Sequence, residues 1–198
     1  LIYDQMSPNQ VVVSVNPLDL DIRDTKIYNP NSKFILYAGM LSDSKGVEEL
    51  INSYLNSNLV DVNLKIIGSG PKEGYLKNKY NYQKIEFLGQ IDNKTTLNYI
   101  LNSRCIVTAT KMYEGQPRLL TEASYLGVPA IFPNFGGMGE FFPKNYELVF
   151  DQFDYEDLTK KINLLDNREY LFDISKDVKK HIQDVFNIYN KQKENLFL

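Results

Sequence analysis

The sequence predicts an α/β fold in which a Rossmann-like parallel sheet carries helices on both faces. Short apolar runs of strand length alternate with segments of helical periodicity between residues 33 and 167. This alternation is typical of βαβ units. The strand-like runs are almost continuously apolar, as expected for parallel strands that are covered on both faces.

Each predicted strand is a short apolar run, and the first of them ends at a glycine. The central strands are expected at residues 34–39, 64–70, 85–89, 105–110 and 128–133, the second of these including a turn. Residues 147–151 are expected to form a short edge strand. A further strand is expected at 10–15, ahead of a linker rich in Pro and Asn that continues to residue 32.

Helices are predicted where apolar residues recur at helical spacing or where a capping residue precedes them. Pro71 suits a first helical turn, because its missing N–H would have no partner there. Asp92 can cap the helix that follows it. The expected helices lie at 44–58, from 71 onwards, from 92 to about 101, at 154–165 and from about 168 to 195.

The composition is that of an ordinary globular protein. The chain has 198 residues, of which 43% are hydrophobic and 24% are charged, and its net charge is −3. Acidic and basic residues are interspersed, which argues against a nucleic-acid partner, because such a partner needs a basic stripe. No apolar run approaches the length of a membrane span. The chain starts with Leu1 rather than Met, so we expect a fragment of a longer protein.

The single cysteine and the single histidine do not predict catalytic or metal chemistry. Cys105 lies in a predicted strand and cannot form an internal disulfide, so we expect a small buried apolar residue in a reducing cytoplasm. His181 lies in a lysine-rich helical segment and is expected to be a solvated surface residue. Without clusters of Cys and His, a structural zinc site is not expected.

Two glutamates, Glu114 and Glu122, flank a predicted turn that follows the strand at 105–110. In an open parallel sheet, ligands bind beyond the carboxyl ends of the strands. Pro117 is expected to be the first helical residue, so the backbone N–H groups of the next three residues would lack helical partners. These amides and the positive end of the helix would together form an anion site that suits a phosphate.

The charged side chains of this region suggest roles toward a sugar and a phosphate. A carboxylate has two acceptor oxygens, so Glu122 can accept both hydroxyls of a ribose diol, and Glu114 can accept hydroxyls of another sugar unit. Lys45, in the loop after the strand at 34–39, would supply a cation to the phosphate. The alternative is that both glutamates only favour a helix N-terminus, at roughly 0.3–1 kcal/mol each, and that Lys45 is a solvated loop charge.

A series of short motifs then occurs in one order along residues 33–165. The series resembles the C-terminal, donor-binding domain of retaining group 1 glycosyltransferases, which have the two-Rossmann-domain GT-B architecture. The match of the glutamate pair with the later GVPAI and GG is fairly specific. The motifs are SKG (44–46), IIGSGP (66–71), FLGQI (87–91), EGQPRLLTEA (114–123), GVPAI (127–131) and FGGMGE (135–140).

The resemblance implies a role for each matching residue. Glu122 would hold the ribose, Glu114 would contact the transferred sugar, and Lys45 would bind the diphosphate, so Glu114 and Lys45 are the expected catalytic residues. The chain around Gln90 and Ile91 would line the base, largely through backbone atoms. Further substrate-binding residues are expected at Gly39, Met40, Gly115, Gln116, Arg118 and Leu119.

The resemblance also implies a reaction and a domain organisation. The donor would be a nucleotide diphosphate sugar, transferred with retention to a saccharide or lipid-linked acceptor without a metal or other cofactor. Cell-surface polysaccharide synthesis, in the cytoplasm or at the inner face of the membrane by peripheral association, is the expected setting. Residues 1–32 would link to a missing acceptor-binding domain, 33–167 would bind the donor, and 168–198 would pack back toward the missing domain. We therefore expect the fragment to bind donor weakly without transferring sugar.

Two positions depart from the family pattern. Met40 stands where the family usually has an arginine that is aimed at the diphosphate, which removes one cation from the site. Arg118, at a position that is usually apolar or Asn, is hypothesised to restore that charge; the alternative is an ordinary surface arginine. Pro117 replaces a frequent glycine, so one N–H is absent.

Two other functional classes would explain parts of the sequence. A dinucleotide-dependent oxidoreductase would explain GSGPKEG (68–74), but the third glycine falls one position late and the motif follows the second strand rather than the first. A non-catalytic glycosyltransferase-like binding or assembly module would explain the loss of arginine at Met40, whereas the retained Glu114, Glu122 and Lys45 argue against it. The base, sugar and acceptor are not fixed by the sequence, although Asp92 would favour guanine if it lay near the base.

Overall fold

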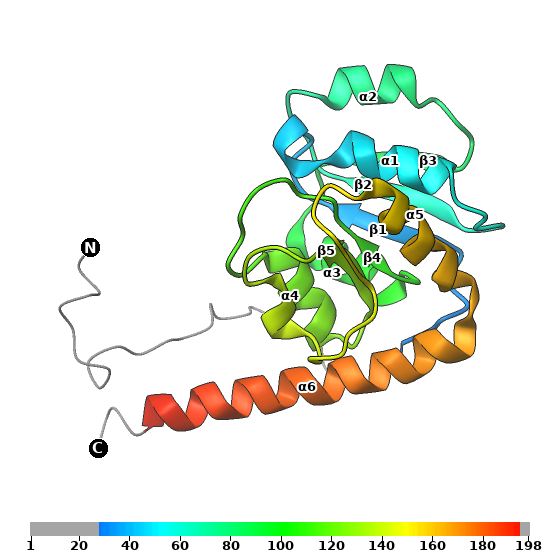
Figure 1. Ribbon diagram of the computed structural model, residues 1–198. Coiled ribbons are helices and arrows are strands. Elements are labelled where there is room, and N and C mark those ends of the chain that lie inside the picture. The colour runs from blue at the N-terminus through cyan, green and yellow to red at the C-terminus, as the bar shows by residue number, and fades with distance from the viewer. Residues whose placement is uncertain (1–27, 195–198) are drawn as a thin grey trace.

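A parallel sheet forms the centre of the molecule (Figure 1). The structure, a computed structural model, describes residues 28–194, and within them the sheet has six strands in the order β3-β2-β1-β4-β5-β6. This confirms the predicted fold class; the strand expected at 10–15 lies outside the described residues. The strands are β1 (Phe34–Ala38), β2 (Asn63–Ile67), β3 (Ile85–Gly89), β4 (Ile106–Val107), β5 (Ala130–Pro133) and β6 (Val149–Phe150).

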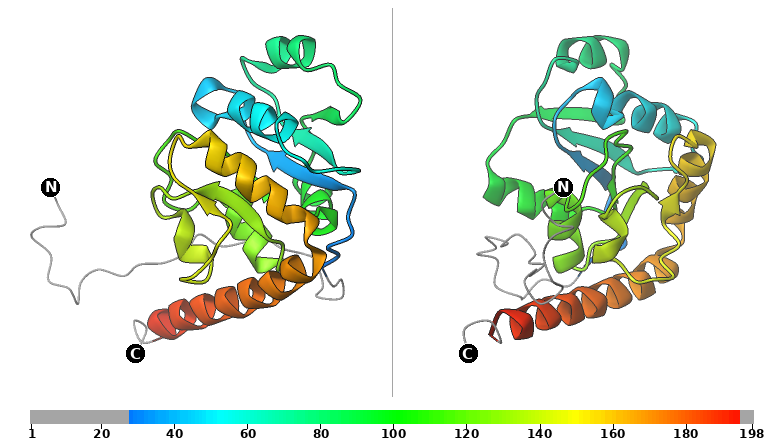
Figure 2. Two further views of the ribbon diagram at one scale, coloured as in Figure 1. Left: turned by 45° about the vertical axis from the view of Figure 1, so that its right-hand side comes forward. Right: turned by 60° about the vertical axis from the view of Figure 1, so that its left-hand side comes forward.

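Helices cover both faces of the sheet, as predicted. Helices α1 and α5 pack together on one face, and α3 and α4 on the other (Figure 2). Helix α6 runs beneath α4 and extends past the sheet. The α-helices are α1 (Val47–Leu55), α2 (Glu73–Lys79), α3 (Asn93–Asn102), α4 (Arg118–Tyr125), α5 (Tyr155–Asn163) and α6 (Arg168–Glu194), and short 3₁₀ turns are η3 (Asp43–Lys45), η4 (Met138–Phe141) and η5 (Leu164–Asp166).

Strand β4 is much shorter than the apolar run at 105–110 predicts. Leu36 of β1 pairs with Ile106, and the chain keeps its hydrogen bonds to β5 as far as Thr108, whose N–H donates to Ile131 O at 2.9 Å. Thr110 then turns its hydroxyl toward Glu114 at 3.0 Å. The strand therefore ends early because the residues after Thr108 belong to a loop and make their contacts there. The edge strand predicted at 147–151 is confirmed as β6, at one end of the sheet.

Helix starts follow the predicted caps in some places and shift in others. Asp92 caps α3, because its carboxylate accepts the Thr95 N–H at 2.9 Å. Pro117 is the N-cap of α4 rather than its first helical residue, with φ −66° and ψ 121°. Helix α2 begins two residues after Pro71, at Glu73, because a turn comes first.

The only cysteine and the only histidine of the chain lie in different surroundings. Cys105 is fully buried, as predicted, and burial raises the pKa of its thiol. His181 is only partly exposed, because its Nε2 lies 3.1 Å from the carbonyl oxygen of Glu140. His181 is thus a surface residue, as predicted, and its ring contacts η4 because α6 packs against that turn.

The first half of α6 packs on this domain. Leu171, Val178 and Ile182 are buried, and the Ser175 hydroxyl donates to Gly127 O at 2.5 Å. The helix predicted from about 168 to 195 is thus confirmed as far as residue 194, and residues 195–198 lie outside the described part.

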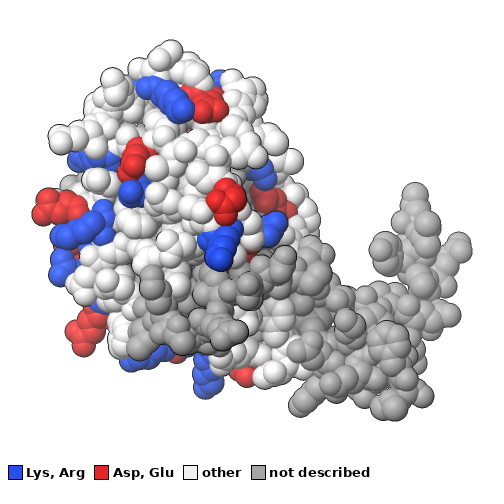
Figure 3. All heavy atoms as spheres, turned by 180° about the vertical axis from the view of Figure 1, so that it is seen from behind, with Lys and Arg blue, Asp and Glu red and all other residues white. Residues whose placement is uncertain are grey.

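Charged side chains of both signs lie beside one another on the described face seen in Figure 3. Many are paired, as Lys65 is with Glu86 at 2.8 Å. Among the helices in residues 28–194, none combines the length and the apolar character that crossing a bilayer requires.

Candidate functional site

A cleft of about 440 Å³ opens at the carboxyl edge of the sheet. The strand order reverses between β1 and β4, and ligands of such sheets bind outside the carboxyl ends at this switch point. The cleft collects residues from the ends of β1, β2 and β3 and from the starts of α3 and α4. Seven predicted substrate-binding residues line it, namely Gly39, Met40, Gln90, Ile91, Arg118, Leu119 and Glu122.

The floor of the cleft is made by close backbone packing between the loops after β1 and β2. Gly68 has φ +131°, and a Cβ there would lie 1.9 Å from the carbonyl oxygen of Gly39. The same loops exchange a hydrogen bond from Leu41 N to Ser69 O at 2.9 Å. The glycines of residues 68–70 therefore allow two loops to touch, which explains them without a dinucleotide fingerprint.

The wall of the cleft is the N-terminal turn of α4. The first helical backbone bond runs from Thr121 N to Pro117 O at 3.1 Å. The amides of residues 118–120 precede this bond, so they lie at the positive end of the helix dipole. Leu119 lines the cleft, which puts this turn beside the space where an anion would bind.

Glu122 and Arg118 form an ion pair on this wall. Arg118 Nε lies 2.7 Å from Glu122 Oε1, one helical turn away, and the side chains are 65% and 5% exposed respectively. Glu122 thus has a partner and also faces the cleft, and Arg118 lines the same cleft. The sequence placed the two residues in one region but did not predict that they would pair.

Lys45 and Glu114, the two predicted catalytic residues, form a second ion pair outside the lining of the cleft. Lys45 Nζ lies 2.6 Å from Glu114 Oε1, which also accepts the Thr110 hydroxyl at 3.0 Å. The two residues are 69 positions apart in the chain, but the loops after β1 and β4 bring them together. Tyr37 is buried under this pair, and its pKa is raised by burial and by the charge of Glu114.

Gly46 and Lys111 hold the loop of Lys45 in place. Gly46 has φ +63°, and a Cβ there would lie 1.9 Å from the carbonyl oxygen of Ala109. Lys111 N donates to Ser44 O at 2.8 Å. The SKG motif is therefore needed for the contact between the loops after β1 and β4, in addition to carrying the lysine.

The paired glycines of FGGMGE pack against the loop of Glu114. A Cβ at Gly136 would lie 2.4 Å from Glu114 O, and a Cβ at Gly137 would lie 2.4 Å from Gly115 O. Gly137 N donates to Glu114 O at 2.9 Å. The backbones of Glu114 and Gly115 are thus fixed by the loop after β5. Gly115 and Gln116 lie beside the cleft, outside its lining.

The predicted base-binding end of the cleft has further polar residues that the sequence reasoning missed. Ser69 donates to the side chain of Gln90 at 3.2 Å, and Asn93 and Thr96 also line the cleft. Their common signal is their place directly after a strand or in the first turn of a helix at the carboxyl edge.

Asp92 caps α3, and its suggested preference for guanine stays a prediction. One carboxylate oxygen accepts the Thr95 N–H and the other accepts the Thr95 hydroxyl at 2.6 Å. These hydrogen bonds lower the pKa of Asp92, and the residue lies outside the cleft lining. Its carboxylate is therefore used as a helix cap.

Metal ligation has no candidate in the described part of the chain. Within residues 28–194, no three side chains of His, Cys, Asp or Glu gather closely enough to hold an ion. Two ion pairs, Lys45–Glu114 and Arg118–Glu122, are among the charged groups at the carboxyl edge.

Sequence comparison supplies the family. Residues 20–181 match the family model described as glycosyl transferases group 1. The chain belongs to this family. CapJ of Staphylococcus aureus is 32% identical over 149 residues, which cover 73% of this chain and 36% of CapJ. A glycosyltransferase of Haemophilus influenzae, described as uncharacterized, is 28% identical over 174 residues, which cover 85% of this chain and 49% of that protein.

Solved structures of other proteins share the fold. The lipopolysaccharide outer core galactosyltransferase WaaB matches with a TM-score of 0.71 and 20% identity, over 98% of this chain and 57% of WaaB. Anabaena HepE, solved in complex with UDP-glucose, matches with a TM-score of 0.68 and 17% identity, over 84% of this chain and 49% of HepE. This group 1 chain spans 36% to 49% of the length of the curated relatives it matches.

Proposed function

We propose that this chain is the donor-binding domain of a glycosyltransferase and that its cleft binds a nucleotide diphosphate sugar. The observation that carries this proposal is the cleft itself, in which Glu122, the first turn of α4 and the loop of Gln90 face one space. Glu122 would accept the hydroxyls of the ribose diol, and the first turn of α4 would bind the diphosphate anion. The loop of Gln90 would offer a flat slot to the base.

The reaction that we propose is transfer of the sugar with retention of configuration to a saccharide or lipid-linked acceptor. The departing nucleoside diphosphate gains negative charge in the transition state, and fixed amides and cations stabilise such charge best. Lys45 and the amides of α4 would supply them, and Glu114 would hold hydroxyls of the transferred sugar. Lys45 and Glu114 already lie 2.6 Å apart, so diphosphate and sugar would meet at one point.

The relatives support a role in cell-surface polysaccharide synthesis. WaaB is named as acting on the lipopolysaccharide outer core, and HepE was solved with UDP-glucose. We therefore propose a UDP-sugar as the first donor to test. No residue of this chain is needed as a metal ligand in this scheme.

Isothermal titration calorimetry with UDP, GDP, ADP and CDP tests the proposal. We expect one nucleotide to bind, and Glu122→Gln to weaken it at least about tenfold, because the ribose loses an ionised acceptor. Glu156→Gln is the matched control, since Glu156 is an exposed residue of α5 on the face opposite α4. If none of the four nucleotides binds, the non-catalytic module is the better description.

A further inference from the structure

Two aromatic side chains form an exposed pair next to Glu114. The ring centroids of Tyr113 and Phe135 are 5.6 Å apart, and the rings meet edge to face at 84°. Tyr113 is 73% exposed and Phe135 is 37% exposed. The two residues come from different loops, those after β4 and β5, so their contact is made by the fold and not by proximity in the chain.

The backbone beneath this pair is fixed. Gly136 and Gly137, directly after Phe135, pack against the carbonyl groups of Glu114 and Gly115, directly after Tyr113. Gly137 N also donates to Glu114 O at 2.9 Å. Because both aromatic residues adjoin this contact and brace each other edge to face, the Tyr113 ring has a defined orientation while it remains open to solvent.

The chemistry around the pair combines an apolar face with hydrogen-bonding groups. Met112, which precedes Tyr113 in the chain, is also exposed. Glu114 follows Tyr113, and its carboxylate is bound by Lys45 and Thr110. A pyranose ring needs this combination, because its C–H groups form an apolar face and its hydroxyls need polar partners.

We propose that Tyr113 and Phe135 form a stacking platform for a pyranose ring, supplied either by the transferred sugar or by the acceptor. This inference rests on the proposed function and assigns it two further substrate-positioning residues. The ring of the nucleotide base is not the occupant, because neither aromatic residue lines the cleft.

A lipid surface fits the pair less well. Anionic membranes attract free lysines close to the inserted apolar side chains. Here the neighbouring lysines are neutralised, Lys45 by Glu114 and Lys111 by Glu49.

The test measures what a sugar adds to the binding of a nucleotide. In one arm, calorimetry compares UDP with UDP-glucose, UDP-galactose and UDP-N-acetylglucosamine; in the other, a microarray of immobilised glycans is probed in the presence of UDP. We expect Tyr113→Ala to reduce the sugar-dependent part of the affinity about tenfold in one arm, which identifies the source of the ring. Phe135→Ala is expected to have a smaller effect in the same arm, and the affinity for UDP alone stays unchanged.

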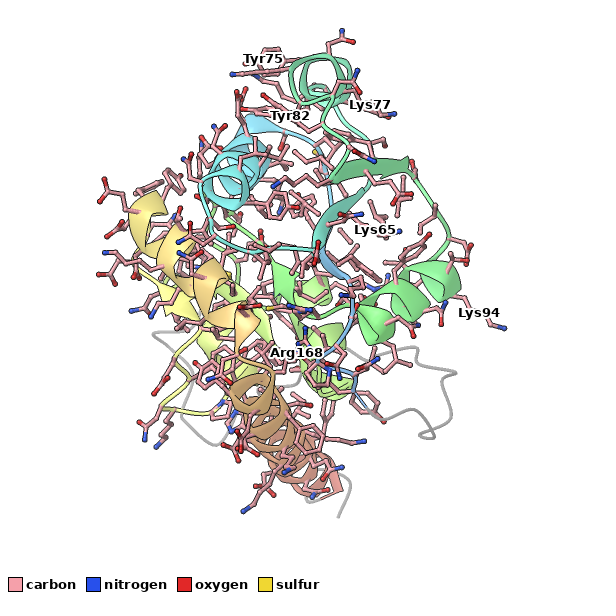
Figure 4. All side chains as sticks on the ribbon, turned by 90° about the vertical axis from the view of Figure 1, so that its right-hand side faces the viewer. Lys65, Tyr75, Lys77, Tyr82, Lys94 and Arg168 are labelled. Atoms are coloured by element: carbon pink, nitrogen blue, oxygen red, sulfur yellow. The ribbon has the colours of Figure 1, made fainter. Side chains whose placement is uncertain are left out.

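Two variants separate stacking from other causes. Tyr113→Phe keeps the ring and is expected to bind like the wild type. Tyr82→Ala removes another exposed tyrosine, which precedes β3 and is labelled in Figure 4, and is expected to change nothing.

The inference is overturned if Tyr113→Ala still binds UDP and leaves the sugar-dependent part of the affinity unchanged in both arms. It is also overturned if Tyr113→Ala abolishes binding to phosphatidylglycerol vesicles while both sugar arms are unaffected. Failure of the wild type to bind UDP or any UDP-sugar overturns the proposed function, and this inference with it.

Discussion

The two edges of the sheet are held together by different means. At the amino edge, side chains donate to backbone carbonyl groups: Tyr54 reaches Val62 O at 2.7 Å, and Arg104 reaches Ser32 O at 2.9 Å. At the carboxyl edge, backbone packs directly on backbone, as Gly68 does on Gly39.

This difference explains where charged side chains face a cleft. At the amino edge, polar side chains hydrogen-bond to the backbone and so stabilise the fold. Arg104 is fully buried there, and burial lowers the pKa of its guanidinium. At the carboxyl edge, glycines supply the contacts between loops, so the carboxylates and cations there are left to pair with one another or with a ligand. A site is thus expected where backbone packing already joins the loops and leaves side chains able to face a cleft.

The substitution with the largest expected effect breaks the glycine contact at the carboxyl edge. Gly68→Ala should lower the free energy of unfolding by about 4 kcal/mol, because the new methyl group meets a carbonyl oxygen and φ is positive. Urea denaturation measures the change. Gly74→Ala, a glycine of α2 with open space around it, is the matched control and should be neutral or slightly stabilising. Equal stability of Gly68→Ala and the wild type would contradict the packing described.

Removing the guanidinium of the amino edge is expected to have the next largest effect. Arg104→Met should cost about 3 kcal/mol of stability, because the carbonyl groups of Ser32 and Leu165 lose their donors. Nucleotide affinity should not change, since this edge lies away from the cleft. Lys94→Met, at a solvent-exposed position labelled in Figure 4, should alter neither property. A loss of nucleotide binding by folded Arg104→Met would show that the two edges are not independent.

The cations of the carboxyl edge are expected to give the smallest change, seen in binding rather than in stability. Lys45→Ala and Arg118→Ala should each weaken binding of a nucleoside diphosphate about tenfold. Lys77→Ala removes an exposed lysine of α2 and serves as the control. Calorimetry decides between the two roles of Arg118: if only Lys45→Ala weakens binding, Arg118 does not replace the arginine absent at Met40.

Local patterns were sufficient to predict much of the fold. The apolar runs located every described strand, and Asp92 was correctly expected to cap α3. Glycine after β1 and the glutamates around α4 located the carboxyl edge, because chain order in a parallel sheet dictates which loops share an edge. These features depend on residues that are close in sequence.

Features that depend on distant partners were not predicted. The pairing of Lys45 with Glu114 joins loops that are 69 residues apart, and nothing near either residue signals the other. The buried role of Arg104 was missed for the same reason, since its acceptors belong to the chain before β1 and to η5. The shortening of β4 reflects backbone groups that find partners outside the sheet: Thr110 O accepts from the Gln152 side chain, and Lys111 N donates to Ser44 O.

The contact between Lys45 and Glu114 sets a condition on whatever enters the site. A ligand that carries only negative charge would pair with the Lys45 ammonium and leave the Glu114 carboxylate without a partner. A neutral polyol would bind the carboxylate and leave the ammonium unpaired. Both members are accommodated at once by a molecule with an anionic part and a hydroxylated part joined at a fixed spacing. If the proposed function holds, a molecule that joins both parts would therefore use this ion pair more fully than either part alone.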